Sequence, residues 1–188
     1  MKLTQTALPE VWLIEPEVYP NNRGYWYYSW DKTAFLEQGL PGEFVQEMQS
    51  KSSMRGALSG LHLQNHENPM AKLVRCIEGE VLDVAVDVRR GSPTYLQWVA
   101  YRLSAENGLM LYVPASGFAH GYLTLTDNAE ILYRLSNFYD GSKQIGIRYD
   151  DPEFGIDWPV KAPILTDRDR NAPYFKDVQE VFIYEESL

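Results

Sequence analysis

The chain has 188 residues, 45% of them hydrophobic and 23% charged, which is enough for one domain with an apolar core and too few for two ordinary domains. Its net charge is −9, whereas proteins that bind nucleic acid or anionic membranes need an excess of Lys and Arg. Both partner classes are therefore disfavoured. A small anionic ligand is still compatible with this charge, because a few cations in one pocket are enough to bind it.

From the residue pattern we expect neither a secretory signal nor a membrane-spanning segment. The first twelve residues contain no apolar run of the length a signal peptide needs, and no run approaches the roughly 20 apolar residues that cross a bilayer. The single cysteine, Cys76, excludes an intrachain disulfide. We therefore expect a cytoplasmic protein.

Taken in chain order, the first clear element is a helix over residues 31–40, with Asp31 as its N-cap and Gly39 near its end. Residues 58–64 then alternate as a strand does. That alternation places Leu58, Gly60, His62 and Gln64 on one face, and Ser59, Leu61 and Leu63 on the other.

Further strands are predicted over residues 72–90, 109–114, 119–126 and 129–139, and a second helix near residues 177–182. Within these strands, the alternation assigns three sets of residues to common faces. They are Leu82, Val84, Val86 and Val88, opposite Asp83, Ala85 and Asp87; then His120, Tyr122 and Thr124; and finally Ala129, Ile131, Tyr133 and Leu135.

Many short strands with little helix indicate an all-β jelly roll or sandwich with a few short helices. We expect one domain over residues 1–188, with a barrel at about 42–140. An N-terminal arm precedes the barrel, and the Pro- and Asp-rich segment from about Asp151 wraps around it.

The three histidines bear on whether the barrel holds a metal. Small cupin-type barrels often bind iron, manganese or zinc through a His-x-His pair, but Gln64 stands where the second His would follow His62, and an amide is a poor ligand for a transition metal. His66 lies in a polar turn. His62 and His120 lie mid-strand beside small residues, and an imidazole is the natural proton carrier near neutral pH.

A collinear set of segments carries a family resemblance. The set is Arg23-Gly24, GLHLQ (60–64), residues 72–94, LSAEN (103–107), VPASGFAHGYLTL (113–125), AEILYR (129–134), IRYDDPEFGIDWP (147–159) and DRDRNAP (167–173). In order and spacing, the set resembles the dTDP-4-dehydrorhamnose 3,5-epimerase family. The resemblance implies a cupin-like barrel that acts on a nucleotide-linked 4-keto-6-deoxyhexose with neither metal nor redox cofactor.

The chemistry of the implied reaction determines which catalytic groups the enzyme needs. The C4 ketone acidifies the hydrogens on C3 and C5, because the carbanion delocalises onto the carbonyl oxygen. An epimerase therefore needs a base on one ring face, a proton donor on the other, and a cation or hydrogen-bond donor at the enolate oxygen.

The resemblance assigns these roles to four catalytic residues. His62 matches the base and Asp169 the acid that orients it, while Tyr133 matches the opposite-face donor and Lys72 the cation. It also implies substrate-binding roles for Arg23, which reaches the diphosphate across a homodimer interface, and for Gln46, Ser59, His120, Tyr139 and Arg168. Asp83 could pair with His120. Taken singly, Tyr133 and Lys72 would by default be a core tyrosine and a solvated lysine, and Asp169 could be part of a surface ion-pair cluster.

Three positions depart from the family pattern. Ser59 replaces an arginine that contacts the diphosphate, Met48 replaces an asparagine near the sugar, and Tyr28 replaces a glutamate of the arm. A serine hydroxyl cannot clamp a phosphate as a guanidinium does. Either the ligand is changed, or Arg55 or Arg75 takes over the missing charge.

Several alternatives stay open at this stage. The reaction could invert one carbon instead of two, or the substrate could be another nucleotide-linked ketosugar that is epimerised or ketoisomerised. A metal-dependent cupin, such as a dioxygenase, is disfavoured by Gln64. A barrel that binds a sugar nucleotide without turnover also fits the altered Ser59 and Met48.

Overall fold

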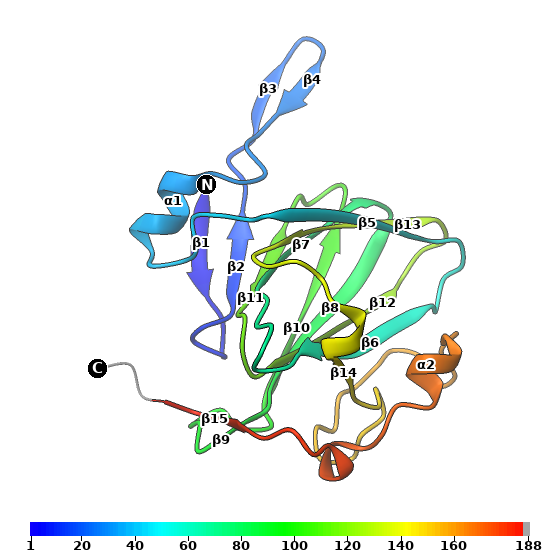
Figure 1. The fold of residues 1–188 in the computed structure, drawn as a ribbon. Coiled ribbons are helices and arrows are strands. Elements are labelled where there is room, and N and C mark those ends of the chain that lie inside the picture. Colours follow the sequence, from blue (N-terminus) through cyan, green and yellow to red (C-terminus); the bar gives the residue numbers. More distant parts are fainter. Residues whose placement is uncertain (186–188) are drawn as a thin grey trace.

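The computed structural model describes residues 1–185, which form two antiparallel sheets packed face to face (Figure 1). The first sheet has the order β1 (Lys2–Gln5), β2 (Trp12–Glu15), β11 (Met110–Val113), β7 (Lys72–Glu78), β13 (Ala129–Leu135) and β5 (Gln46–Ser52). The second has the order β10 (Trp98–Ser104), β8 (Glu80–Asp87), β12 (Phe118–Thr124), β6 (Leu58–Gln64) and β14 (Gln144–Gly146). The expected all-β jelly-roll fold is confirmed.

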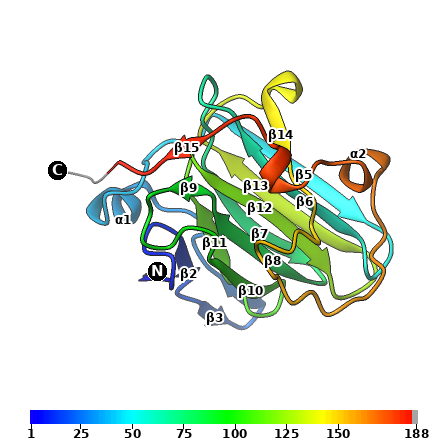
Figure 2. The same cartoon turned by 90° about the horizontal axis from the view of Figure 1, so that it is seen from below.

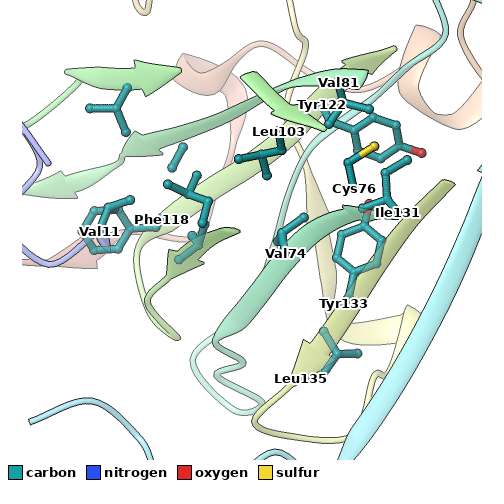
Figure 3. Close-up of a cluster of buried hydrophobic side chains, with 14 of the residues drawn as sticks. Val11, Val74, Cys76, Val81, Leu103, Phe118, Tyr122, Ile131, Tyr133 and Leu135 are labelled. Carbon is teal, nitrogen blue, oxygen red and sulfur yellow. The ribbon is translucent and has the colours of Figure 1, made fainter. Parts of the chain in front are cut away.

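The main core lies between these sheets, where the inward faces of the strands meet (Figure 3). Ile131, Tyr133 and Leu135 of β13 point into it together with Val74 of β7, and Tyr122 of β12 closes it from the facing sheet. The predicted faces of the strands at 119–126 and 129–139 are thus confirmed. Alternation works here because each strand is buried on its inward side.

Two further apolar layers cover the outer faces of the sheets. The C-terminal segment, orange to red in Figure 2, crosses the five-stranded sheet and packs Ile147, Phe154 and Phe182 against Val84 and Val86. On the six-stranded sheet, α1 (Lys32–Glu37) buries Phe35 completely and is N-capped by Asp31, as predicted.

A hairpin of β3 (Tyr19–Asn21) and β4 (Gly24–Trp26) projects from the body of the molecule (Figure 1). Tyr19 stacks on Trp26 with 4.4 Å between ring centroids, while Tyr25 and Tyr28 are 59% and 60% exposed. The remaining elements are β9 (Arg89–Arg90), η1 (Gly141–Lys143), α2 (Asp167–Arg170), η2 (Phe175–Asp177) and β15 (Phe182–Ile183). Among the described residues, no helix is long and apolar enough to span a membrane.

The chain after residue 165 differs from the sequence prediction. The helix predicted near residues 177–182 is wrong: η2 ends at Asp177, and the chain then runs extended into β15, which pairs parallel with β9. The extended path lets Phe182 reach the buried layer against β8. The sheets also include β1, β2 and β14, which lie outside the range 42–140 predicted for the barrel.

The prediction that Ser59 and His62 face opposite sides of their strand is also wrong. His62 pairs with His120 and Ser59 with Tyr122, so three steps along β6 match two along β12. This β-bulge shifts the alternation by one residue, and both Ser59 and His62 line the same pocket.

Gly60 makes the bulge possible. It has φ +124°, and a Cβ there would lie 2.6 Å from the Cα of Gly121 and 2.9 Å from the carbonyl oxygen of His120. A side chain at this position would therefore push apart the two strands that carry His62 and His120.

Replacing Gly60 by alanine should lower the free energy of unfolding by about 3 kcal/mol or more, because backbone strain and overpacking add. Gly24→Ala is the matched control, since Gly24 has φ +136° but a Cβ there would meet no atom within 4 Å, and it should cost only about 1 kcal/mol. Urea denaturation measures both. Equal losses in the two variants would show that the contact with Gly121 does not constrain the strands.

Candidate active site

A pocket opens between the two sheets, at the end where β6, β7 and β13 present their polar inward residues. Its walls combine histidine, lysine, tyrosine and serine side chains with two methionines. Of the ten residues predicted for the site, six line it: Ser59, His62, Lys72, His120, Tyr133 and Tyr139.

The partly buried His62 and the buried Asp169 form a hydrogen-bonded pair at one wall. The Nε2 of His62 lies 2.6 Å from Oδ1 of Asp169, which is 3% exposed. Asp169 sits in α2, a single helical turn whose N-cap is Thr166, and the Oγ1 of Thr166 accepts from the backbone N–H of Asp169. Since the carboxylate accepts a hydrogen from Nε2, the lone pair of the ring stays on Nδ1.

Burial and the hydrogen bond shift the pKa values of both His62 and Asp169. Burial lowers the pKa of His62 below its usual value, although the hydrogen bond with Asp169 opposes the shift, and the charges of Lys72 and Arg168 lower it further. For Asp169, burial alone would raise the pKa, but the hydrogen bond and charge of His62 hold it below the ordinary value. At neutral pH the pair is a neutral imidazole beside a carboxylate, which is the state a general base requires.

Lys72, the first residue of β7, brings its ammonium group into the pocket. Its Nζ donates to the backbone carbonyl of His62 at 3.3 Å. Burial lowers the pKa of Lys72 to about 8, and the negative charge of Asp83 partly counters the shift. Among the described lining residues Lys72 is the only Lys or Arg.

Tyr133 lies on β13, across the pocket from the five-stranded sheet. Burial raises its pKa well above the usual value, and the nearby Tyr122 and Asp83 add to the shift, so the phenol keeps its proton throughout the physiological range. The ring of His120 meets Tyr133 edge-on at 6.2 Å, and Nε2 of His120 lies 2.9 Å from Oδ1 of buried Asp83. The His120–Asp83 pairing expected from the sequence is therefore present.

The pocket mouth is shaped by hydrogen-bonded loops. The Tyr139 hydroxyl donates to Oε1 of Gln144 at 2.7 Å, and the Tyr139 backbone N–H donates to Oε1 of Gln46 at 2.9 Å. Gln46 thus supports Tyr139 and does not itself line the pocket. The amide of Gln64 donates to the carbonyl of Asp140 and accepts from Asn68, so it holds the same loops.

Four arginines considered from the sequence lie outside the pocket. Arg23 is exposed at the tip of the β3–β4 hairpin (Figure 1), and Arg168 lines a neighbouring groove that shares Gln144 with the pocket. Arg75 stacks over Tyr27 at 5.8 Å, and Arg55 lies in an exposed turn. Neither Arg55 nor Arg75 is among the described lining residues, so neither replaces the missing charge at Ser59 within this pocket.

Sequence reasoning gave no site role to four lining residues with polar or adaptable side chains: Tyr122, Gln144, Met70 and Gln64. Tyr122 had a signal, because alternation placed it on the same face as His120. Gln144 and Met70 lie next to loops, where no periodicity marks them. Met48, noted only as a departure, also lines the pocket and is 43% exposed.

Taken together, the pocket holds a neutral imidazole, a protonated phenol and a buried ammonium. This set suits removal of a proton next to a carbonyl, with a proton returned from another side and the enolate charge met by the cation. Among residues 1–185, no three His, Cys, Asp or Glu side chains converge in a way that could hold a metal ion.

Comparison with known proteins identifies the family of the chain. The family model for dTDP-4-dehydrorhamnose 3,5-epimerase matches residues 5–177. The chain is 48% identical to dTDP-4-dehydrorhamnose 3,5-epimerase of Pseudomonas aeruginosa, over 94% of this chain and 97% of that protein.

Two solved structures share the fold. The dTDP-6-deoxy-D-glucose-3,5-epimerase of Legionella pneumophila in complex with dTDP-4-keto-L-rhamnose has a TM-score of 0.92 at 36% identity, over 98% of each chain. ChmJ, a 3'-monoepimerase from Streptomyces bikiniensis in complex with dTDP-quinovose, has a TM-score of 0.84 at 34% identity, over 90% of this chain and 85% of that one. This chain belongs to the dTDP-4-dehydrorhamnose 3,5-epimerase family and is an isomerase.

Proposed function

We propose that the protein inverts C3, C5 or both in a nucleoside-diphosphate 4-keto-6-deoxyhexose of the dTDP type, with His62 as base and Tyr133 as acid. One observation carries this proposal: a neutral imidazole and a protonated phenol line the same pocket, and burial favours the uncharged form of each. The relatives at high coverage are named for this reaction on dTDP sugars.

The steps follow from these groups. His62 removes the proton next to the C4 ketone, and Asp169 stabilises the imidazolium that forms. The ammonium of Lys72 stabilises the enolate oxygen. Tyr133 then donates its proton to the same carbon from the other ring face, which inverts the centre. A second round on the other α-carbon would complete a double epimerisation.

The ring also needs binding contacts beside the reacting atoms. We assign His120 and Tyr139 to the sugar and the linked phosphates, because both line the pocket wall. Ser59 lies on the same wall but supplies only a hydroxyl. The diphosphate therefore needs cations from outside the pocket, and Arg168 in the adjoining groove is one source within the chain.

Arg23 is the second source, if it comes from another copy of the chain. The hairpin that carries it projects from the body and exposes Tyr25, Trp26 and Tyr28, a cluster typical of a surface that a partner covers. We propose a homodimer in which each hairpin brings Arg23 to the nucleotide end of the partner's site, where the side chain of Gln46 also contacts the nucleotide.

We further place the enzyme in the cytoplasm. Cys76 is a buried thiol whose pKa burial raises to about 11, and as the single cysteine it forms no intrachain disulfide. The fold therefore needs no oxidising compartment.

Hydrogen exchange tests the reaction. The protein is incubated with dTDP-4-keto-6-deoxyglucose in deuterated water, and the C3 and C5 signals are followed by NMR. Exchange at both positions identifies a double epimerase and at one position a monoepimerase. His62→Asn should abolish exchange, whereas His66→Asn, in an exposed turn, should leave it unchanged. No exchange by the wild type with dTDP-, CDP-, GDP- or UDP-linked substrates would refute the proposal.

The pH profile of kcat/KM should be bell-shaped. Activity rises as His62 loses its proton, at a pKa below the ordinary 6.5, and falls as Lys72 loses its charge near pH 8. Tyr133 remains protonated across this range. In Lys72→Met the rate should drop by about 10²–10³ and the alkaline limb should vanish. An alkaline limb that stays near pH 8 in this variant would assign it to another group.

Subunit complementation tests whether the hairpin that carries Arg23 serves the site of the partner chain. A dimer of two His62→Asn chains should be inactive. A dimer of two Arg23→Ala chains should bind the substrate weakly. A mixed dimer, isolated through two different tags, should regain about half of the wild-type activity, because one of its two sites then has an intact base and an intact arm. If each arm serves its own chain, both sites in the mixed dimer stay defective, and no activity returns.

A further inference from the structure

A single loop brings Tyr139 to the pocket. This mouth loop, residues 136–143, joins β13 of the six-stranded sheet to β14 of the five-stranded sheet, so it crosses from one sheet to the other. Tyr139 lines the pocket and is 43% exposed, so little packing surrounds its ring. The bond from its hydroxyl to Gln144 orients the ring only if the backbone beneath it is held in place.

The peptide between Phe138 and Tyr139 is held at both of its polar atoms. Its carbonyl oxygen, on Phe138, accepts from Nδ2 of Asn68 at 2.9 Å. Its N–H, on Tyr139, donates to Oε1 of Gln46 at 2.9 Å. Asn68 lies in the turn after β6, and Gln46 begins β5. This peptide therefore cannot rotate without losing a hydrogen bond to an element outside the loop.

Gln64 holds the backbone on the other side of Tyr139. Its Nε2 donates to the carbonyl oxygen of Asp140 at 3.1 Å, and its Oε1 accepts from Nδ2 of Asn68 at 2.7 Å. The Nδ2 of Asn68 thus uses both of its hydrogens, one on Gln64 and one on Phe138. Each amide fixes the orientation of the other, so we call Gln64 and Asn68 together the amide clamp.

The burial of Gln64 makes this clamp stiff. Gln64 ends β6, two residues after His62, and is 2% exposed. A buried amide that loses its partners finds no water to replace them, so the bonds to Asp140 and Asn68 are costly to break. The residue that stands where a second histidine would follow His62 therefore serves to hold the mouth loop.

The other bonds between the turn and the mouth loop lie away from this peptide. Nδ2 of Asn137 donates to Oδ1 of Asn68 at 2.8 Å, near the start of the loop. At its end, the backbone N–H of Asn65 donates to the carbonyl oxygen of Lys143 at 2.9 Å. These bonds fasten the ends of the loop, whereas the amide clamp acts directly beside Tyr139.

We propose that Gln64 and Asn68 are positioning residues, which hold Tyr139 in place before the substrate arrives; this rests on the proposed binding role of Tyr139. Neither amide needs to contact the substrate. Asn68 is not among the described lining residues, and both polar atoms of the Gln64 amide are engaged with the protein. A loop that is already ordered loses less conformational entropy on binding, so the clamp raises affinity and leaves the proton transfers unaltered.

Asn68→Ala and Gln64→Met remove the clamp from either side. In each variant, KM for dTDP-4-keto-6-deoxyglucose and Kd for dTDP should rise about tenfold, while kcat stays within about twofold of the wild-type value. Asn65→Ala is the matched control. It removes an amide from the same turn whose side-chain oxygen has no hydrogen-bond partner among the described residues, and it keeps the backbone bond to Lys143. This control should bind and turn over as the wild type does.

Amide hydrogen exchange in the free protein gives a readout that needs no turnover. Peptides that cover residues 136–143 are followed by mass spectrometry. In Asn68→Ala and Gln64→Met this segment should exchange about tenfold faster than in the wild type, because the loop opens more often. Segments of β7 and β8 should keep their protection, which shows that the variants are folded.

A Tyr139→Ala background separates positioning from direct contact. There, Asn68→Ala and Gln64→Met should raise KM no further, because the side chain that the clamp positions is gone. A further rise in KM would overturn the proposal, since the amides would then act on the substrate or on the whole pocket. Wild-type affinity and wild-type loop exchange in Asn68→Ala would overturn it as well. Failure of the proposed function appears instead in the wild type, as absence of exchange at C3 and C5, and the affinity for dTDP then still tests the clamp.

Discussion

The structure depends on one constraint. A pocket for an anionic substrate has to lie between two sheets whose inward faces are otherwise apolar. The hydrogen bond between His62 and Asp169 meets this constraint at one wall, and it joins a central strand to a helical turn 107 residues later in the chain. The C-terminal segment that delivers Asp169 is anchored by the apolar layer around Phe154 and Phe182. Packing outside the barrel therefore fixes the position of His62 inside it.

The same burial prepares the proposed base, His62, and the proposed acid, Tyr133, at once. Removing water disfavours whichever form is charged, so it lowers the pKa of His62 and Lys72 and raises that of Tyr133. An imidazole that prefers to be neutral is a ready base, and a phenol that prefers to be neutral is a ready acid. No specific partner is needed to separate the two roles. The energetic cost falls on the charged forms, and the carboxylate of Asp169 stabilises the charged form of His62.

The sequence predicted most of the fold because alternation is reliable where one strand face is buried. Tyr133 and His120 were placed on inward faces in this way, and the pairing of His120 with Asp83 was anticipated; the structure brings all three together. The bulge at Gly60 was not predicted, since it depends on backbone crowding against Gly121 rather than on side-chain pattern. The predicted helix near residues 177–182 failed for a related reason: the burial of Phe182 and the pairing of β15 outweigh local helical preference.

The bulge at Gly60 also bears on substrate specificity, because it determines which way Ser59 faces. Because the bulge turns Ser59 inward, residue 59 faces the pocket, and the absence of a guanidinium there leaves the pocket itself with less positive charge. Lys72 is the only Lys or Arg among the described lining residues, and its ammonium is held beside the carbonyl of His62. A diphosphate carries more charge than one ammonium can balance, so its binding has to rest on cations held at the rim. Under the proposed function these cations are Arg168, on the C-terminal turn α2, and Arg23 of the proposed second copy, on the projecting hairpin. With these proposed roles, proton chemistry and nucleotide binding are carried by different layers of the structure, and the second can diverge while the first is kept.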